Sequence, residues 1–225
     1  MRTPGHDEEL AAGYLLAEGV ITSRSEIAGI FPAGVAPSNE VLVELRPGVD
    51  LDSWRLARTS FLSSSCGVCG KQSREAFIPV GQTLATEGIN FNSNLISRLP
   101  DLLREQQQGF AQTGGLHAAA LIDSAGQLIQ AFEDIGRHNA LDKLLGWCLL
   151  RDMLPLSRYA LFLTSRSSFE LVQKSIAAGA PVLGTVGSPS SLAIETARDF
   201  GLTLIGFVRG DRMNVYSGEW RIHSK

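Results

Sequence analysis

The second half of the chain alternates between short apolar runs and segments whose apolar residues recur every three or four positions. Apolar runs of this length predict strands, and the longer periodic segments predict helices. The predicted strands are 116–122, 128–132, 159–164, 182–186, 202–208 and 213–216, and the predicted helices are 138–150, 168–178 and 190–200. This alternation is typical of a largely parallel sheet with helices on both faces.

The first half is less regular, and it begins with a helix predicted at 7–19. Asp7 is expected to cap this helix and Gly19 to end it. Its expected apolar face consists of Leu10, Tyr14 and Ala17. Further along, we expect a Gly/Pro-rich loop at 29–39, a strand at 41–45, and a helix at 93–108 that Ser93 caps and Pro100 kinks or divides. We therefore divide the chain into an N-terminal α+β part, residues 1–112, and an α/β domain, residues 113–225.

Three polar loops follow the predicted parallel strands, at 164–168, 187–191 and 209–212. Ligands of open α/β sheets bind beyond the carboxyl ends of the strands. Serine hydroxyls, arginines and free backbone amides suit phosphate groups. The sequence therefore predicts a ligand-binding edge formed by these loops, although none of them matches a known phosphate-loop pattern.

Composition narrows the class of protein. The chain has 225 residues, 44% hydrophobic and 19% charged, which is enough apolar material for a real core. Its net charge of −3 argues against a nucleic-acid partner, because duplex binders are usually basic. It has no apolar run long enough to span a membrane and no signal-like start. Three cysteines do not make a secreted disulfide framework, so we expect a soluble, cytoplasmic protein with reduced thiols.

Cys66 and Cys69 form the strongest local motif, a CxxC pair within a glycine- and serine-rich loop. A helix beginning near Gly70, together with Lys71, would favour a reactive thiolate. Two other interpretations remain open. A zinc site would need further ligands from His117, His138 or Cys148, because one CxxC supplies only two. A thioredoxin-like redox pair is the other, although such motifs accompany an early βαβ unit.

The densest polar cluster, residues 133–139, lies between a predicted strand and a predicted helix. Asp134 or Asn139 could simply cap the helix. Capping does not account for Arg137 and His138, which we interpret as ligand-binding residues, since arginine forks onto phosphate oxygens. By contrast, His117 is expected to be a satisfied core histidine and Cys148 an inert core thiol.

The last polar segment is Phe207, Val208, Arg209, Gly210, Asp211 and Arg212, at the end of a predicted strand. It offers two arginines for phosphate and an aromatic ring for stacking. A solvated turn near the C-terminus explains the same residues equally well.

Taken together, these motifs resemble the FdhD family of formate dehydrogenase accessory sulfurtransferases. The similarity runs through most of the chain, in stretches that keep their order. These stretches are residues 2–5 (RTPG), 10–19, 65–70 (SCGVCG), 114–119 (GGLHAA), 133–143 (EDIGRHNALDK), 164–166 (TSR), 170–172 (ELV), 188–189 (SP) and 206–209 (GFVR).

The resemblance implies a cytidine-deaminase-like fold, a three-layer α/β sandwich with a mostly parallel sheet. It implies a sulfur carrier that receives persulfide sulfur from a cysteine desulfurase on Cys66, with Cys69 assisting. The sulfur would pass to the molybdenum or tungsten of a bis(molybdopterin guanine dinucleotide) cofactor for formate dehydrogenase. Residues 207–212 match the family's cofactor-binding stretch, and we extend the predicted site to Arg137 and His138. A homodimer is expected from the family alone.

The chain departs from the family pattern at its N-terminus. Family members usually have residues before the Arg-Thr-Pro-Gly motif, so we expect a truncated chain or a start assigned late.

A zinc deaminase would carry His-x-Glu and a later Pro-Cys-x-x-Cys. Here the CxxC comes first and Ala118-Ala119 follow His117, so no catalytic zinc is expected. The alternative functions are a cofactor chaperone without chemistry and a thiol–disulfide oxidoreductase.

Overall fold

The computed structural model describes residues 1–34, 39–49 and 89–223. Its helices are α1 (Asp7–Ala17), α3 (Ser93–Gln106), α4 (Gln108–Thr113), α5 (Arg137–Leu150), α6 (Phe169–Ala177) and α7 (Ser191–Phe200). Its strands are β1 (Ile27–Ala33), β2 (Glu40–Leu45), β3 (Phe91–Asn92), β4 (His117–Asp123), β5 (Leu128–Asp134), β6 (Tyr159–Leu163), β7 (Val182–Thr185), β8 (Thr203–Arg209), β9 (Arg212–Ser217) and β10 (Ile222–His223). None of the helices in these ranges is long and apolar enough to cross a bilayer.

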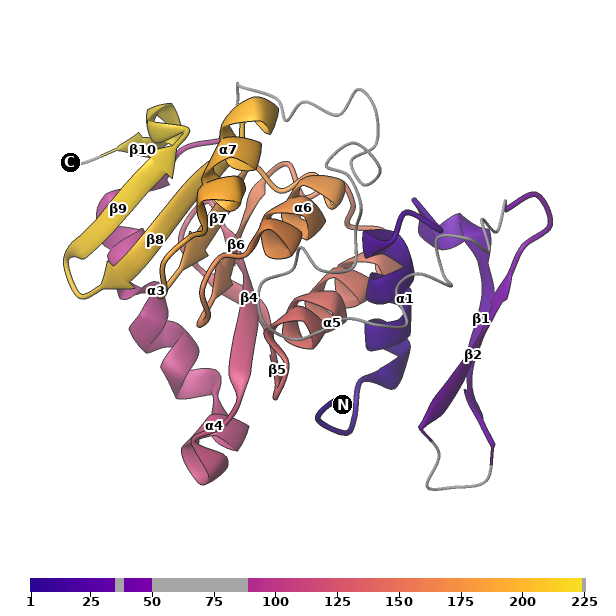
Figure 1. The fold of residues 1–225 in the computed structure, drawn as a ribbon. Coiled ribbons are helices and arrows are strands. Elements are labelled where there is room, and N and C mark those ends of the chain that lie inside the picture. The colour runs from indigo at the N-terminus through magenta and orange to yellow at the C-terminus, as the bar shows by residue number, and fades with distance from the viewer. Residues whose placement is uncertain (35–38, 50–88, 224–225) are drawn as a thin grey trace.

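A six-stranded sheet with the order β5-β4-β6-β7-β8-β9 forms the centre of the molecule (Figure 1). Strands β6, β7 and β8 are parallel, and the pairs at both edges are antiparallel. Helices α5, α6 and α7 cover one face and α3 covers the other. The predicted three-layer α/β fold is confirmed, with its parallel strands at the centre of the sheet.

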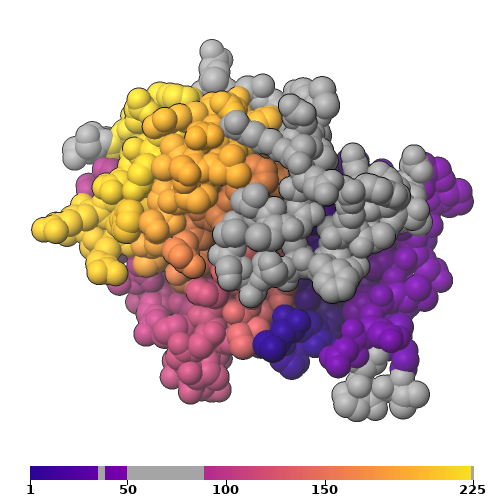
Figure 2. Space-filling model, in the orientation of Figure 1, coloured from indigo at the N-terminus to yellow at the C-terminus, as the bar shows by residue number. Residues whose placement is uncertain are grey.

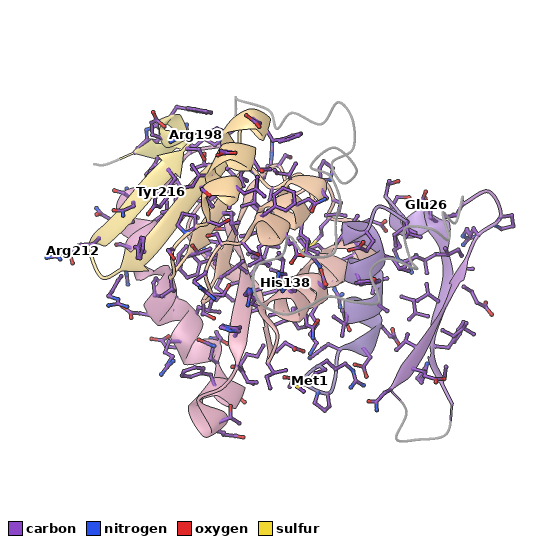
Figure 3. All side chains as sticks on the ribbon, viewed as in Figure 1. Met1, Glu26, His138, Arg198, Arg212 and Tyr216 are labelled. Carbon is purple, nitrogen blue, oxygen red and sulfur yellow. The ribbon has the colours of Figure 1, made fainter. Side chains whose placement is uncertain are left out.

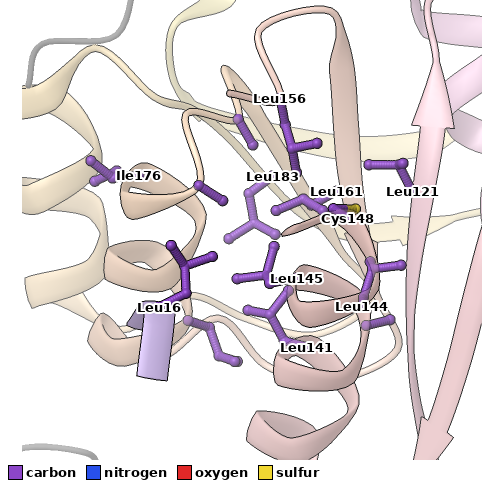
Figure 4. Close-up of a cluster of buried hydrophobic side chains, with 14 of the residues drawn as sticks. Leu16, Leu121, Leu141, Leu144, Leu145, Cys148, Leu156, Leu161, Ile176 and Leu183 are labelled. Carbon is purple, nitrogen blue, oxygen red and sulfur yellow. The ribbon is translucent and has the colours of Figure 1, made fainter. Parts of the chain in front are cut away.

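Two hydrophobic cores explain why the central strands read as unbroken apolar runs. In β4, Ala119 and Leu121 face the α5–α7 layer, whereas Ala118, Ala120 and Ile122 face α3. Successive strand residues point to opposite faces, so a strand covered on both sides needs apolar residues throughout. Figure 4 shows the larger core, where leucines of α5 pack against Leu161 and Leu183 of the sheet. Each such buried leucine contributes roughly 1.5–3 kcal/mol to folding.

Helix α1 packs against α5 across a close contact between two glycines. A side-chain carbon on Gly13 would overlap the carbonyl oxygen of Asp142, and one on Gly146 would overlap that of Glu9. Of the predicted apolar face of α1, Ala17 is buried, whereas Leu10 and Tyr14 are half-buried, and the other buried residues are Ala12, Gly13 and Leu16. The predicted cap was wrong, because His6 occupies the N-cap position and Asp7 is the first helical residue.

The loop predicted at 29–39 was wrong over its first part, because β1 extends to Ala33 and pairs with β2 in a two-stranded antiparallel ribbon. The ribbon packs against α1 (Figure 1). Pro32 is tolerated in β1 because each strand of such a ribbon has a free edge. Helix α3 is capped by Asn92 and not by Ser93 as predicted, and Pro100 does not divide it, since it lies within one continuous helix.

Candidate functional site

The loops after β6 and β7 lie side by side at the carboxyl edge of the sheet, as predicted. Ser167 donates its backbone N–H to the Ser188 carbonyl at 3.1 Å and accepts one from Ser190 at 3.0 Å. These bonds extend the parallel pairing of the two strands by one bridge, between Ser167 and Pro189. Helices α6 and α7 begin immediately afterwards, with Ser168 and Ser190 as N-caps. Two helix N-termini, each carrying a partial positive charge, therefore lie next to each other.

A cavity of about 220 Å³ opens beside these helix ends. We call it the arginine–serine cavity, and its lining residues are Arg137, Arg166, Ser167, Ser168, Ser188, Pro189 and Ser190. Two guanidinium groups, four hydroxyl groups and two helix N-termini all favour an anion there. This cavity is suited to phosphate groups.

Arg137 has an orphaned nitrogen beside this cavity. Its Nε atom is buried and has no hydrogen-bond partner in the part of the chain that the structure describes. Helix α5 begins at Arg137, after the N-cap Gly136, so neither Asp134 nor Asn139 caps it as the simpler interpretation expected. A buried donor without a partner is rare in folded proteins and calls for an explanation, such as a bound ligand or water.

His138 is turned to a different set of partners. Its Nε2 atom lies 2.8 Å from Glu170 Oε2 and 3.4 Å from the Ser168 hydroxyl. Figure 3 labels His138 close to the centre of the molecule. His138 does not line the arginine–serine cavity, whereas its partner Ser168 does. The structure thus brings Arg137 to the cavity and places His138 behind the N-terminus of α6.

A buried ion pair ties the N-terminal segment to this edge of the sheet. Asp134, fully buried at the end of β5, lies 2.8 Å from the ammonium of Lys143. Thr3 donates its backbone N–H to Asp134 at 3.0 Å and accepts from Lys143 at 2.9 Å. The second Asp134 oxygen accepts from Gly136 N–H and from the Asn139 amide. Both oxygens of the buried Asp134 carboxylate therefore have partners.

The 207–212 segment comprises the end of β8, the turn at Gly210 and Asp211, and the first residue of β9. Figure 2 shows this hairpin projecting at one edge of the visible face, and Figure 3 labels Arg212 at its tip. Phe207 adopts a left-handed backbone with φ of 54°, which is uncommon for a residue with a side chain, and the residue is 47% exposed. Its backbone N–H donates to Gly187 at 3.1 Å, which joins the hairpin to the loop after β7.

A second cavity, of about 500 Å³, is lined in part by Thr164 and Val186, at the start of the same two loops. We call it the glutamine cavity, and it is lined by Pro100, Asp101, Arg104, Gln107, Phe110, Gly114, Gly115, Leu116, His117, Thr164 and Val186. His117 is therefore a half-buried cavity residue and not a core histidine. Burial lowers the pKa of His117 below its usual value, and the nearby Arg137 and His138 lower it further.

The two motif cysteines, Cys66 and Cys69, lie outside the described residues, so their predicted roles stay predictions. Cys148 is buried in the core, and burial raises the pKa of its thiol to about 12. The prediction of an inert core thiol is confirmed. Among residues 1–34, 39–49 and 89–223, no three His, Cys, Asp or Glu side chains are grouped so that they could hold a metal.

Comparison with known proteins then decides the family. The model of the FdhD/NarQ family matches residues 1–223. This chain belongs to the FdhD/NarQ family. The predicted resemblance is confirmed, and the match covers the 207–212 hairpin and both cavities as well as the cysteine motif.

Other FdhD/NarQ proteins resemble the chain over almost its full length. The sulfur carrier protein FdhD of Streptomyces avermitilis is 47% identical over 230 residues, which cover 99% of this chain and 82% of that protein. The protein of the same name from Mycobacterium tuberculosis is 44% identical over 232 residues, covering 99% and 84%. Among solved structures, a "putative formate dehydrogenase accessory protein" from Desulfotalea psychrophila matches with a TM-score of 0.75 and 27% identity, covering 99% of this chain and 83% of that one.

Sequence reasoning missed several residues of this edge in the FdhD/NarQ chain. Arg166 and the serines were recognised only as members of polar loops. Thr3 was seen as part of a motif without a partner, since Asp134 lies 131 residues away. Gln107 was predicted only as part of the helix at 93–108, and nothing in that prediction marked it as buried, although it is 3% exposed. Only its place at the break between α3 and α4, which no spacing pattern marks, explains its burial.

Proposed function

We propose that this chain carries sulfur as a persulfide on Cys66 and passes it to the metal of a bis(molybdopterin guanine dinucleotide) cofactor. The metal is molybdenum or tungsten, and the client enzyme is a formate dehydrogenase. Two findings support this proposal: close relatives bear the name sulfur carrier protein FdhD, and a similar solved structure is described as a formate dehydrogenase accessory protein.

The observation that carries the proposal is the arginine–serine cavity. The proposed cofactor has a diphosphate in each nucleotide arm, and this cavity offers two arginines and two helix N-termini to such a group. The orphaned Nε of Arg137 would gain a charged partner on binding. We assign the guanine end to the 207–212 hairpin. There Phe207 is exposed and could stack on the base, and Arg209 and Arg212 are exposed beside it.

The sulfur steps balance without an added oxidant. The Cys66 thiolate attacks the outer sulfur of a persulfide on a cysteine desulfurase, and the donor cysteine leaves as a thiolate. Once the cofactor is bound, Cys69 would attack the inner sulfur of the Cys66 persulfide, so that a Cys66–Cys69 disulfide forms and the outer sulfur leaves as hydrosulfide, ready to bind the metal. A small cellular thiol reduces the disulfide for the next cycle. Because this cycle requires reduced thiols, we place it in the cytoplasm.

In this scheme the protein's own contribution is positioning. Holding the nucleotide arms at the sheet edge fixes the metal in one place, so that sulfur delivery becomes effectively unimolecular. The partners are a cysteine desulfurase, a formate dehydrogenase and, in a homodimer, a second copy of this chain.

The test is detection of the persulfide by intact mass. Wild type, Cys66→Ala, Cys69→Ala and Cys148→Ala are each incubated with a cysteine desulfurase and free cysteine. We expect a desulfurase-dependent gain of one sulfur atom in every form except Cys66→Ala. Cys148→Ala is the matched control, because the buried Cys148 thiol, with its pKa raised to about 12, should take up no sulfur.

An adduct that survives in Cys66→Ala would contradict the assignment of the carrier. No adduct in any form, with guanosine diphosphate binding intact, would favour the cofactor chaperone. Rapid insulin reduction that needs both motif cysteines would favour the thiol–disulfide oxidoreductase.

A further inference from the structure

Gln107 lines the glutamine cavity and also a neighbouring cavity of about 300 Å³ beside Thr3 and Glu133, and its side chain carries a buried hydrogen-bond donor without a partner among the described residues. Gln107 is 3% exposed, and its Nε2 atom bonds to nothing within the described ranges. Its backbone groups are satisfied, since its N–H donates to Arg104 and its carbonyl accepts from Ala111. The orphaned group is therefore the side-chain amide. Burying an amide without a partner costs about 1–3 kcal/mol, which a ligand with an acceptor at this point would recover.

The rest of the cavity wall combines planar side chains with polar ones. The guanidinium carbon of Arg104 lies 3.9 Å from the centroid of the Phe110 ring, so the two groups form a stacked pair. Asp101 adds a carboxylate acceptor. His117, whose pKa is lowered by burial, is neutral near pH 7 and can donate or accept. These groups suit a planar ring with a carbonyl acceptor and adjacent N–H donors.

The position of the cavity limits which part of a dinucleotide could reach it. Thr164 and Val186 line the glutamine cavity, whereas Arg166 and Ser188, two residues further along each loop, line the arginine–serine cavity. Both loops therefore border both cavities, and the residues that line one cavity are only two positions from those that line the other. A ligand whose diphosphate occupies one cavity therefore has the other within reach.

We propose that the glutamine cavity binds the 2-amino-4-oxo ring of the pterin end of the cofactor. This inference rests on the proposed function, which assigns the guanine end to the 207–212 hairpin. Pterin and guanine share the 2-amino-4-oxo edge, so the chemistry of the cavity accepts either ring, and the assigned position of the guanine leaves this cavity to the pterin. The volume of about 500 Å³ falls in the range of roughly 300–1,000 Å³ that small-molecule sites occupy.

The test measures binding of free 6-hydroxymethylpterin, by its own fluorescence, to the full chain. We expect the wild type to bind it and Gln107→Met, which has a similar length but no amide, to bind about tenfold more weakly. Gln112→Met is the matched control, because Gln112 is exposed on α4 and lines neither cavity. The melting temperature of Gln107→Met should not fall, since the variant removes an unsatisfied buried group.

A second probe examines the edge of the ring. Lumazine carries an oxygen in place of the 2-amino group and should bind more weakly than pterin, because Asp101 would lose a donor. Equal binding of the two compounds would contradict recognition of that edge. Equal pterin affinity of wild type and Gln107→Met would show that the amide faces only water, and would overturn the site.

Parallel titrations with guanosine diphosphate separate this inference from the function on which it rests. We expect Gln107→Met to bind the nucleotide as the wild type does. If this variant loses nucleotide affinity instead, the cavity holds the guanine ring and the pterin assignment is wrong. A protein that forms the persulfide and binds the nucleotide but not the pterin retains the proposed function and loses this inference.

Discussion

Asp134 and Arg137 are three residues apart at the same edge of the sheet, yet the fold gives their side chains opposite environments. Asp134 is fully buried, and both of its oxygens accept hydrogen bonds, from Lys143, Thr3, Gly136 and Asn139. Arg137 faces a cavity, and within the described residues its buried Nε has no partner. Satisfied buried groups hold a fold together, whereas a buried donor left without a partner is available to a ligand.

The largest effect is expected on stability, at Asp134 and its partner Lys143. Lys143→Met would leave the Asp134 carboxylate buried without its counter-charge, so we expect the free energy of unfolding to fall by about 3–5 kcal/mol. Urea denaturation measures this change. The double variant Asp134→Asn/Lys143→Met should recover part of the loss, because it removes both charges. If the double variant loses as much stability as the two single variants, Asp134→Asn and Lys143→Met, added together, the ion pair does not provide the stability.

A smaller effect, on binding and not on stability, is expected at the unsatisfied side. Arg137→Met should weaken guanosine diphosphate binding by about 10- to 100-fold, because a hydrogen bond to a charged group contributes roughly 1.5–3 kcal/mol. Calorimetry measures the affinity. Arg158→Met is the matched control, since Arg158 is exposed beside β6 at the opposite edge of the sheet. Equal affinities of the two variants would remove Arg137 from the site.

The smallest effect concerns His117, whose pKa is lowered by burial and by the charges of Arg137 and His138. Below a pH of about 6.5, the unfolded chain takes up a proton at this residue before the folded protein does. The wild type should therefore lose stability as the pH falls from about 6.5 toward the lowered folded pKa. His117→Gln should make that decline shallower, as unfolding measured across this pH range would show. Identical pH profiles would mean that the folded pKa of His117 is not lowered.

The carboxyl edge of the sheet was predicted correctly where the signal lies in neighbouring residues of the sequence. Strands β6, β7 and β8 were recognised from their apolar runs, so the loops that follow them were placed together correctly. Strand β1 was missed because glycine and proline weaken the strand signal, while pairing with β2 supplies what the local sequence lacks. The contact of Thr3 with Asp134 and the burial of Gln107 depend on packing between distant segments. No periodicity in the sequence encodes either.

The contact between Gly13 and Gly146 also restricts how this protein can change. A side chain at either position would occupy the space of the opposite helix backbone, so neither glycine can be replaced unless the two helices move apart. Such a movement would shift α5, whose first turn carries Arg137 and His138. Two residues without side chains, neither of which lines either cavity, therefore set how far the edge of the sheet can vary among functional versions of this chain.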